Sequence, residues 1–266
     1  MLRPYPYADI FNDMKADEQQ PLATHSGAPS PCAARSASQT KPIPSLENGD
    51  RLTREEFERR FDATPGLKKA ELIEGVVFMP AAVRWVQHGG PDFWIHKWLA
   101  FYQDATPGVQ GGSDSSIRLD PRNEPQPDVV LFIDPACGGQ LRVDEQGYLS
   151  GAPELAVEIS SSSVSIDLHA KFEVYRRNGV REYLVWRVLD AEVDWFVLRE
   201  DKYDRLKSGE AGILKSEVFP GLWLDAAALV RGDLKRVREV LGQGLASPEH
   251  AAFVARLQQS PSNPNG

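Results

Sequence analysis

The chain has 266 residues, a formal net charge of -8 and a sequence pI of about 5.2. Its content of 41% hydrophobic and 26% charged residues is that of a globular protein, and its acidic balance is not that of a general nucleic-acid-binding protein. Two cysteines argue against a disulfide framework or a cysteine zinc site. No apolar run approaches the roughly 18 residues of a membrane span, and the N-terminus lacks the apolar core of a signal peptide, so a cytoplasmic location is expected.

Composition divides the chain into three parts. Residues 1–48 are rich in Pro, Ser, Ala and Gln and are expected to be disordered, because they cannot bury enough apolar surface to offset their ordering entropy. Residues 49–230 are expected to form one domain. Residues 231–266 are expected to form a C-terminal helix followed by a disordered tail.

The first half of the domain begins with two helices and a hairpin. Thr53-Arg-Glu-Glu56 is a capping box that opens a short helix ending near Arg60. Residues 68–80 are expected to form a hairpin or a bent strand turning near Gly75, with Glu71 and Glu74 on opposite faces. A helix with a broad apolar stripe is predicted within 88–104, starting near Pro91.

Strands dominate the rest of the domain. Three are predicted at 108–119, 125–134 and 153–160, and the last two are apolar on both faces, as central strands are. A polar surface segment, residues 135–152, is expected between the last two strands. Further on the pattern predicts a helix at 165–178, a strand at 180–188, a hairpin at 192–207 turning at Glu200-Asp201, and a strand with a short helical turn within 216–230. The fold class is therefore α/β (α+β), with a mixed sheet and a C-terminal β-hairpin extension.

Three carboxylates lie at or beside predicted strands: Glu71, Asp128 and Glu158. Asp128 opens one strand, and Glu158 lies inside an apolar one, where an unpaired carboxylate is costly. Two such carboxylates on neighbouring strands repel each other unless a cation lies between them, and hard oxygen ligands suit Mg²⁺ or Mn²⁺. Lys171 on the following helix would assist the chemistry, with Asp167 and Tyr175 four residues to either side of it.

Each of these residues also has a purely structural explanation. Asp128 could end a turn, Glu158 could form a buried ion pair with Lys171 or Arg176, and Asp167 with Lys171 could be a surface helix pair. Their combination favours a functional site. His88 either contacts a carboxylate or substrate, or only begins a helix. The basic stretch contacts a DNA backbone or is a solvated face; it consists of Arg176, Arg177, Arg181 and Arg187, with Lys171.

Other catalytic classes fit less well. A serine hydrolase built from the serine run 160–163 with Asp167 and His169 would need a nucleophile elbow, and the chain has no G-x-S-x-G. Gly111-Gly112 is not followed by a predicted helix, so a phosphate-binding loop is not indicated.

From about Leu52 to Val230 the chain resembles the Uma2-type endonucleases (DUF820), which belong to the PD-(D/E)xK nuclease superfamily. The matching pieces are ELIEG (71–75), His88, QPD (126–128), PELAVEIS (153–160), DLHAKFEVYRRNGVREYLVWRV (167–188) and SEVFPGLWL (216–224). The resemblance implies a restriction-endonuclease-like αβββαβ core. It also implies that Asp128 and Glu158 bind the metal, that Lys171 is the catalytic lysine and that Glu71 adds a carboxylate.

One departure from the superfamily pattern concerns the lysine. The pattern places it two residues after the glutamate, where this chain has Ser160, so Lys171 must reach the site from the helix. The hypothesis is a Mg²⁺-dependent DNA endonuclease. The alternative is a nuclease-fold protein that acts in nucleic-acid binding or assembly without turnover, and an RNA or nucleotide substrate stays open. Apolar residues of the 192–207 hairpin, if exposed, would serve a homodimer.

Overall fold

The computed structural model describes residues 42–80 and 83–259, except for the side chain of Glu210. Residues 1–41 of the expected disordered segment lie outside this range. The residues from Ile43 onward belong to one compact unit. Leu46 is buried against the hairpin and helix that follow it, so the ordered part begins before residue 49, earlier than composition predicted.

A six-stranded mixed sheet forms the centre of the fold, with strand order β11-β10-β9-β8-β5-β3. β8 and β9 are parallel, and the other neighbours are antiparallel. Every residue of β5 and β8 is buried, as expected for strands apolar on both faces. The strands are β3 (Val109–Ser113), β5 (Val129–Ile133), β8 (Leu155–Ser160), β9 (Glu182–Arg187), β10 (Glu192–Arg199) and β11 (Lys202–Arg205).

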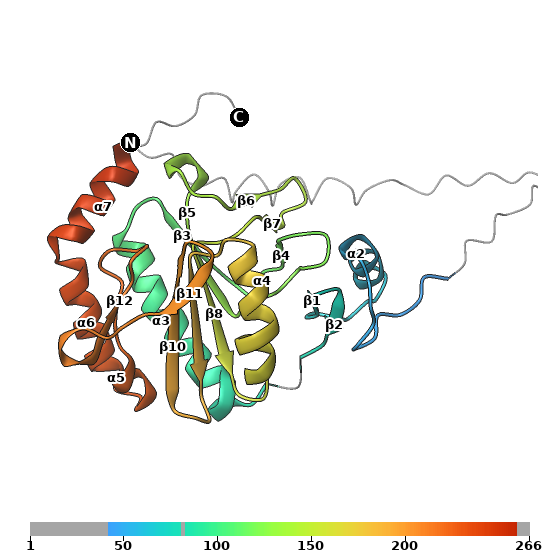
Figure 1. Ribbon diagram of the computed structural model, residues 1–266, viewed down its shortest axis with the longest axis horizontal. Coiled ribbons are helices and arrows are strands. Elements are labelled where there is room, and N and C mark those ends of the chain that lie inside the picture. Colours follow the sequence, from blue (N-terminus) through green and yellow to red (C-terminus); the bar gives the residue numbers. More distant parts are fainter. Residues whose placement is uncertain (1–41, 81–82, 260–266) are drawn as a thin grey trace, which may run out of the picture. The chain divides into compact units, whose positions relative to one another are not determined.

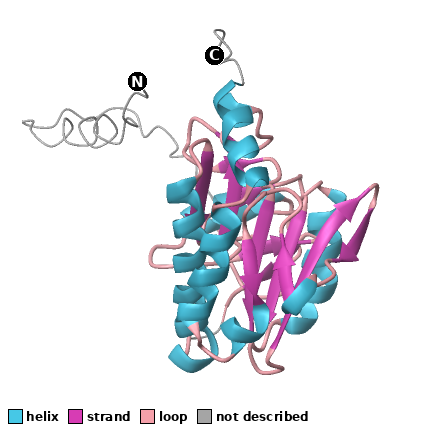
Figure 2. Cartoon of the chain, turned by 90° about the vertical axis from the view of Figure 1, so that its left-hand side faces the viewer, coloured by secondary structure: helices cyan, strands magenta, loops and turns pink. Residues whose placement is uncertain are grey.

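Helices cover both faces of this sheet (Figures 1 and 2). On one side α3 (Gly90–Ala105), α5 (Ala226–Val230) and α6 (Leu234–Leu245) pack on Leu155 and Val157 of β8 and their neighbours. On the other side α4 (Phe172–Arg177) packs on Ala156. Because side chains alternate along a strand, Glu158 faces α4. No helix in the described part of the chain is both long and apolar enough to cross a membrane.

A smaller cluster consists of α2 (Arg54–Asp62) and the hairpin of β1 (Glu71–Ile73) and β2 (Val76–Phe78). The Thr53 side chain accepts from the amide of Glu56 as predicted, but the Glu56 carboxylate pairs with two arginines of its own helix instead of reaching back. The hairpin turns at Glu74 and Gly75, whose φ angles are 54° and 74°. The turn is where the sequence predicted it, and it leaves Glu71 on the first strand.

The single strand expected at 108–119 is instead two strands in different sheets. β3 ends at Ser113, where Asp114 takes a left-handed φ of 46° and breaks the extended chain. β4 then joins a three-stranded sheet with two strands of the 135–152 segment, which was expected to be only a surface excursion. The added elements are β4 (Ile117–Arg118), η2 (Pro135–Cys137), β6 (Arg142–Val143) and β7 (Leu149–Ser150).

The C-terminal part departs most from the prediction. After β12 (Ile213–Lys215), β13 (Trp223–Asp225) and α5, two further helices follow, α6 and α7 (Pro248–Gln259). The expected low-order tail is therefore wrong for 248–259. Their buried side chains join the main core: Val237, Leu241, Phe253 and Leu257. Within each helix the two named residues are four apart, which places them on one face of the helix.

The hairpin of β10 and β11 turns at Glu200-Asp201, as the alternation predicted. Its large apolar side chains pack within the protomer: Val193, Trp195 and Val197 are buried, and Phe196 and Tyr203 pack against the core cluster under α4. The hairpin therefore exposes none of its large apolar side chains, so it gives no support to a homodimer, which stays a prediction from the sequence.

Glu124, which bridges to Leu72 of β1, gives the fold a pH dependence. Burial and the adjacent Glu58 carboxyl raise the pKa of Glu124 from 4.5 to about 8. The folded state therefore holds this proton more tightly than the unfolded state. Stability is expected to fall as pH rises from about 4.5 to about 8, by at most about 1.4 kcal/mol per pH unit from this group.

Glu124→Gln is expected to flatten that part of the profile and to stabilise the protein most at the alkaline end. Urea unfolding between pH 5 and pH 8.5 measures this effect. Glu145→Gln, a change of the same kind at an exposed position, serves as the control. Parallel profiles for Glu124→Gln and the wild type would contradict the assignment.

Candidate functional site

Lys171 lies at the centre of a buried charge cluster. Its Nζ is 2.8 Å from Glu71 Oε1, 3.0 Å from Glu158 Oε1 and 3.6 Å from Asp167 Oδ1. Glu71 comes from β1, Glu158 from β8 and Lys171 from the last position of η3 (Ile166–Lys171). The segment after the serine turn thus brings the lysine to the strand carboxylate, although Ser160 occupies the position where the superfamily pattern has lysine.

The surroundings of the cluster keep Lys171 charged. Burial alone would lower the pKa of Lys171, but attraction by Glu158, Glu71 and Asp167 outweighs it and raises that pKa well above its ordinary value. Burial raises the pKa of Glu158, and Lys171 opposes that rise. Tyr175 donates its hydroxyl to Glu158 Oε1 at 3.0 Å, and burial followed by the charge of Glu158 raises the pKa of Tyr175, so it stays a donor.

The serine turn holds Asp167 in place. The hydroxyls of Ser160 and Ser163 both donate to Asp167 Oδ2, the second at 2.6 Å. The Tyr183 hydroxyl donates to the Asp167 backbone carbonyl at 3.0 Å. The two serines therefore hold the carboxylate beside Lys171 in place. This role agrees with the sequence-based judgement that neither of them is the nucleophile of a serine hydrolase.

Asp128 lies one strand away from Glu158. Val129 of β5 pairs with Val157 of β8, so one further step along the two strands places Asp128 opposite Glu158. Residues that face each other in this way have Cβ atoms roughly 5 Å apart. Asp128 Oδ2 also accepts the amide of Ile159 at 2.7 Å, which ties the two strands together at this point. The two carboxylates are therefore neighbours.

His88 contacts this second carboxylate. Its Nε2 is 3.5 Å from Asp128 Oδ1, and its Nδ1 lies 3.0 Å from the Ile159 carbonyl oxygen. Of the two alternatives for His88, contact with a carboxylate is the one that the structure has. His88 lies on η1 (Trp85–Gly89), directly before α3.

Lys69 belongs to the site and was missed from the sequence, whereas Gln126 was noted only as part of the matching piece QPD. Lys69 Nζ is 2.7 Å from Asp114 Oδ1 and 3.3 Å from Asp128 Oδ1. The backbone amide of Gln126 donates to Glu71 Oε1 at 2.7 Å. A signal for Lys69 was present, because it lies two residues before Glu71 and side chains two apart in an extended segment share a face.

Both η1 and the first turn of the helix expected at 165–178 are π-helical. The expected regular helix is therefore α-helical only over α4. π-Helical turns are rare and concentrate at functional sites. Here they carry His88, Asp167 and Lys171.

A divalent metal fits the donor set, although no group of three or more His, Cys, Asp or Glu side chains gathers as a metal site in residues 42–80 and 83–259. Mg²⁺ is commonly held by one or two carboxylates and completes its octahedron with water and phosphate oxygens, which a neighbouring Asp128 and Glu158 allow. The charge balance also favours a cation, because Glu71 and Asp167 add two further carboxylates near one buried lysine.

The basic stretch of α4 and β9 is mostly neutralised. Arg176 pairs with Glu173, Arg177 with Glu74, and Arg187 with three acidic residues at 190, 192 and 194. These pairs favour the solvated-face explanation for this stretch over contact with a DNA backbone.

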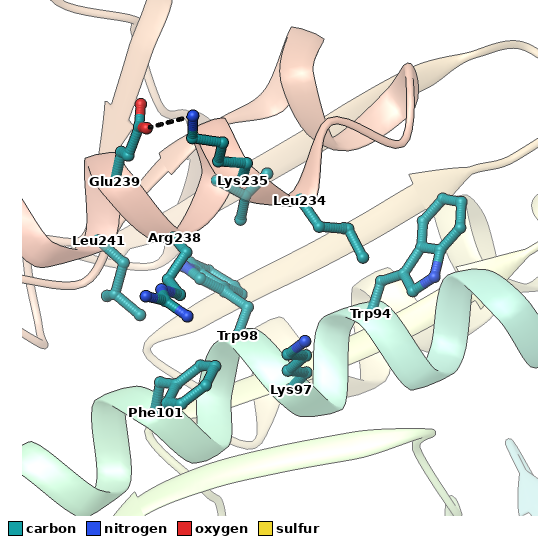
Figure 3. A pocket seen from close by; sticks show the side chains of 10 residues that line it. Trp94, Lys97, Trp98, Phe101, Leu234, Lys235, Arg238, Glu239 and Leu241 are labelled. Atoms are coloured by element: carbon teal, nitrogen blue, oxygen red, sulfur yellow. Dashed lines mark ion pairs between the residues drawn. The ribbon is translucent and has the colours of Figure 1, made fainter.

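A pocket of about 320 Å³ lies on the opposite side of the sheet from Glu158, between α3 and α6 (Figure 3). Aromatic residues of α3 form much of its wall, and cationic residues line it from both helices. Its lining includes Trp94, Lys97, Trp98, Phe101, Leu234, Lys235 and Arg238. It is separate from the charge cluster around Lys171.

The family model described as "Uma2: Putative restriction endonuclease" matches residues 54–227. The chain belongs to the Uma2 family. The family resemblance proposed from the sequence is confirmed, and the matched range includes Glu71, Asp128, Glu158 and Lys171. The restriction-endonuclease-like α+β fold class is confirmed as well.

A crystal structure of a "putative nuclease belonging to DUF820" from Anabaena variabilis ATCC 29413 is similar to this Uma2 chain. The two share 12% sequence identity, with a TM-score of 0.49. The similarity covers 71% of this chain and 99% of that chain. No curated protein matches.

Proposed function

We propose that this Uma2 protein is a metal-dependent DNA endonuclease that hydrolyses backbone phosphodiesters. The observation that carries the proposal is the position of Lys171, buried between Glu158 and Glu71 with Asp128 on the neighbouring strand. The strand carboxylates supply oxygen ligands for a hard cation, and the lysine beside them supplies a fixed positive charge for a phosphate.

Asp128 and Glu158 would hold the ion, Mg²⁺ or Mn²⁺. When bound, the ion supplies an activated water and stabilises charge on the phosphoryl oxygens. Lys171, held protonated by the carboxylates around it, offsets charge that develops on the phosphate. Glu71 and Asp167 orient the lysine.

The remaining contacts position the two carboxylates. Tyr175 fixes one oxygen of Glu158, and the amide of Ile159 fixes one oxygen of Asp128. His88 and Lys69 lie on the other oxygen of Asp128 and are both more exposed than Lys171, so they can meet substrate phosphates. The cytoplasmic location stays a prediction from the sequence.

Cleavage of plasmid DNA with Mg²⁺ or Mn²⁺ tests the proposal. Glu158→Gln is expected to lower the cleavage rate about 100-fold or more, since the ion's contribution is worth several kcal/mol. Glu154→Gln changes another buried glutamate on the approach to β8, which accepts amides of Ile133 and Gln140 away from Lys171. It is expected to retain cleavage. Equal rates for wild type and Glu158→Gln would refute the site assignment.

The alternative is a nuclease-fold protein that binds nucleic acid without turnover. The extensive pairing of Lys171 favours it, because an ion pair cluster can be purely structural. Calorimetric titration with Mn²⁺ separates the two functions. The endonuclease requires binding heat that Asp128→Asn removes, whereas the absence of any Asp128-dependent heat supports the alternative.

A further inference from the structure

Exposed aromatic side chains concentrate at one place in the described chain. Trp85, Phe93 and Phe101 are 71%, 68% and 39% exposed, and every exposed Trp or Phe of residues 42–80 and 83–259 is among these three. All three lie on η1 and α3. Large aromatic rings left in water on one surface mark an interaction site.

These rings form one stripe along α3. Phe93 and Phe101 are eight residues apart and so share a face of the helix, with the exposed Lys97 midway between them. The Trp85 ring continues the stripe, because it lies against Gly90, where an added Cβ would come within 3.4 Å of the indole. Gly90 lies one turn before Phe93. We call Trp85, Phe93, Lys97 and Phe101 the α3 stripe.

Unpaired positive charge accompanies the rings. Arg84, Lys97 and Arg238 are exposed, and among the described residues none of them has a carboxylate within ion-pair distance. Figure 3 shows Lys97 and Phe101 on α3 and Arg238 on the facing α6, around the same pocket. In a chain of net charge -8, this excess of cations is local, and it contrasts with the paired arginines of α4 and β9.

The stripe begins at the candidate active site. His88 lies on the same π-helical turn as Trp85 and contacts Asp128. The N-terminal end of the α3 stripe therefore lies on the same short segment as a side chain of the candidate site.

We propose that the α3 stripe binds an unpaired segment of the DNA substrate, with bases stacked on the three rings and phosphates on Arg84, Lys97 and Arg238. This inference rests on the proposed function and adds that the preferred substrate carries a single-stranded segment. Aromatic platforms beside cations are the usual means of holding single strands, whereas in a duplex the base faces are already stacked. A second copy of the chain fits less well, since a two-fold contact would bring the unpaired cations together.

Fluorescence anisotropy with a labelled 20-nucleotide oligo(dT) and a duplex of equal length tests the proposal. The titration is done in EDTA with the full chain, so binding is measured without cleavage. The wild type is expected to bind the single strand more tightly than the duplex. Phe93→Ala and Phe101→Ala are each expected to weaken single-strand binding about tenfold, and Lys97→Ala to reduce its salt dependence.

Val143→Ala removes an apolar side chain of similar exposure on β6, in a separate sheet, and is expected to leave binding unchanged. Because the titration contains no free divalent ion and measures binding alone, its outcome is distinguishable from a failure of the proposed cleavage. Equal affinity for duplex and single strand would overturn the proposal. So would unchanged binding by the aromatic variants, or loss of a dimer in light scattering when Phe93 is replaced.

Discussion

Replacing Lys171 by methionine is expected to slow metal-dependent cleavage strongly and to destabilise the fold at the same time. Loss of a preorganised positive charge at a reacting phosphate is expected to lower kcat about 10²- to 10³-fold. Unfolding free energy is expected to fall by about 3–5 kcal/mol, because the substitution leaves Glu158 buried without its cation. Plasmid cleavage and urea unfolding at pH 7 measure the two effects.

A double-mutant cycle separates the two losses. Adding Glu158→Gln to Lys171→Met is expected to recover much of the stability, since the uncompensated charge is removed, but none of the cleavage. Lys68→Met alters an exposed lysine three residues before Glu71 and is expected to change stability by less than about 0.5 kcal/mol. Normal cleavage by Lys171→Met would show that the lysine is only structural.

Substitution of Gly244 is expected to show how firmly the C-terminal helices belong to the core. A Cβ at Gly244 of α6 would lie 2.1 Å from the Gly221 carbonyl oxygen and 2.9 Å from Trp223 Cγ. Backbone on one side and a ring on the other leave little room to adjust, so Gly244→Ala is expected to cost about 3 kcal/mol or more.

Gly242→Ala is the matched control on the same helix. A Cβ at Gly242 meets nothing within 4 Å, so the helix is expected to gain about 0.5–1 kcal/mol from the better helix former. Thermal and urea unfolding compare the two variants. Equal effects of the same sign would mean that α6 does not pack against Gly221 and Trp223.

The strands at the centre were predictable because their signal is local. The continuous apolar runs of β5 and β8 indicate burial on both faces, and the position of Glu158 within such a run marks it as unusual whatever lies around it. The glycine turn of the β1–β2 hairpin and the turn of β10–β11 were predictable for the same reason, since turn chemistry involves only a few adjacent residues.

The parts that were wrong or missing depend on distant partners. The strand expected at 108–119 is interrupted at Asp114, although the amino-acid composition of that segment allowed it to continue. Helix α7 forms where its apolar side chains pack into the main core. Lys69 reaches Asp128 across 59 residues of sequence, and His88 reaches Ile159 across 71. Local patterns do not encode such contacts, because they depend on how separate elements pack.

The sequence by itself determined the family, the central strands and most of the charged residues from which the candidate site is built, Lys69 excepted. Tertiary structure decided which of them meet. It brings Lys171 between Glu71 and Glu158 and pairs the arginines of α4 and β9 with acidic residues. It also leaves the aromatic rings of the α3 stripe exposed. The physical reason is that alternation and turn chemistry act over a few residues. Charge pairing and exposure depend on which elements pack together in space.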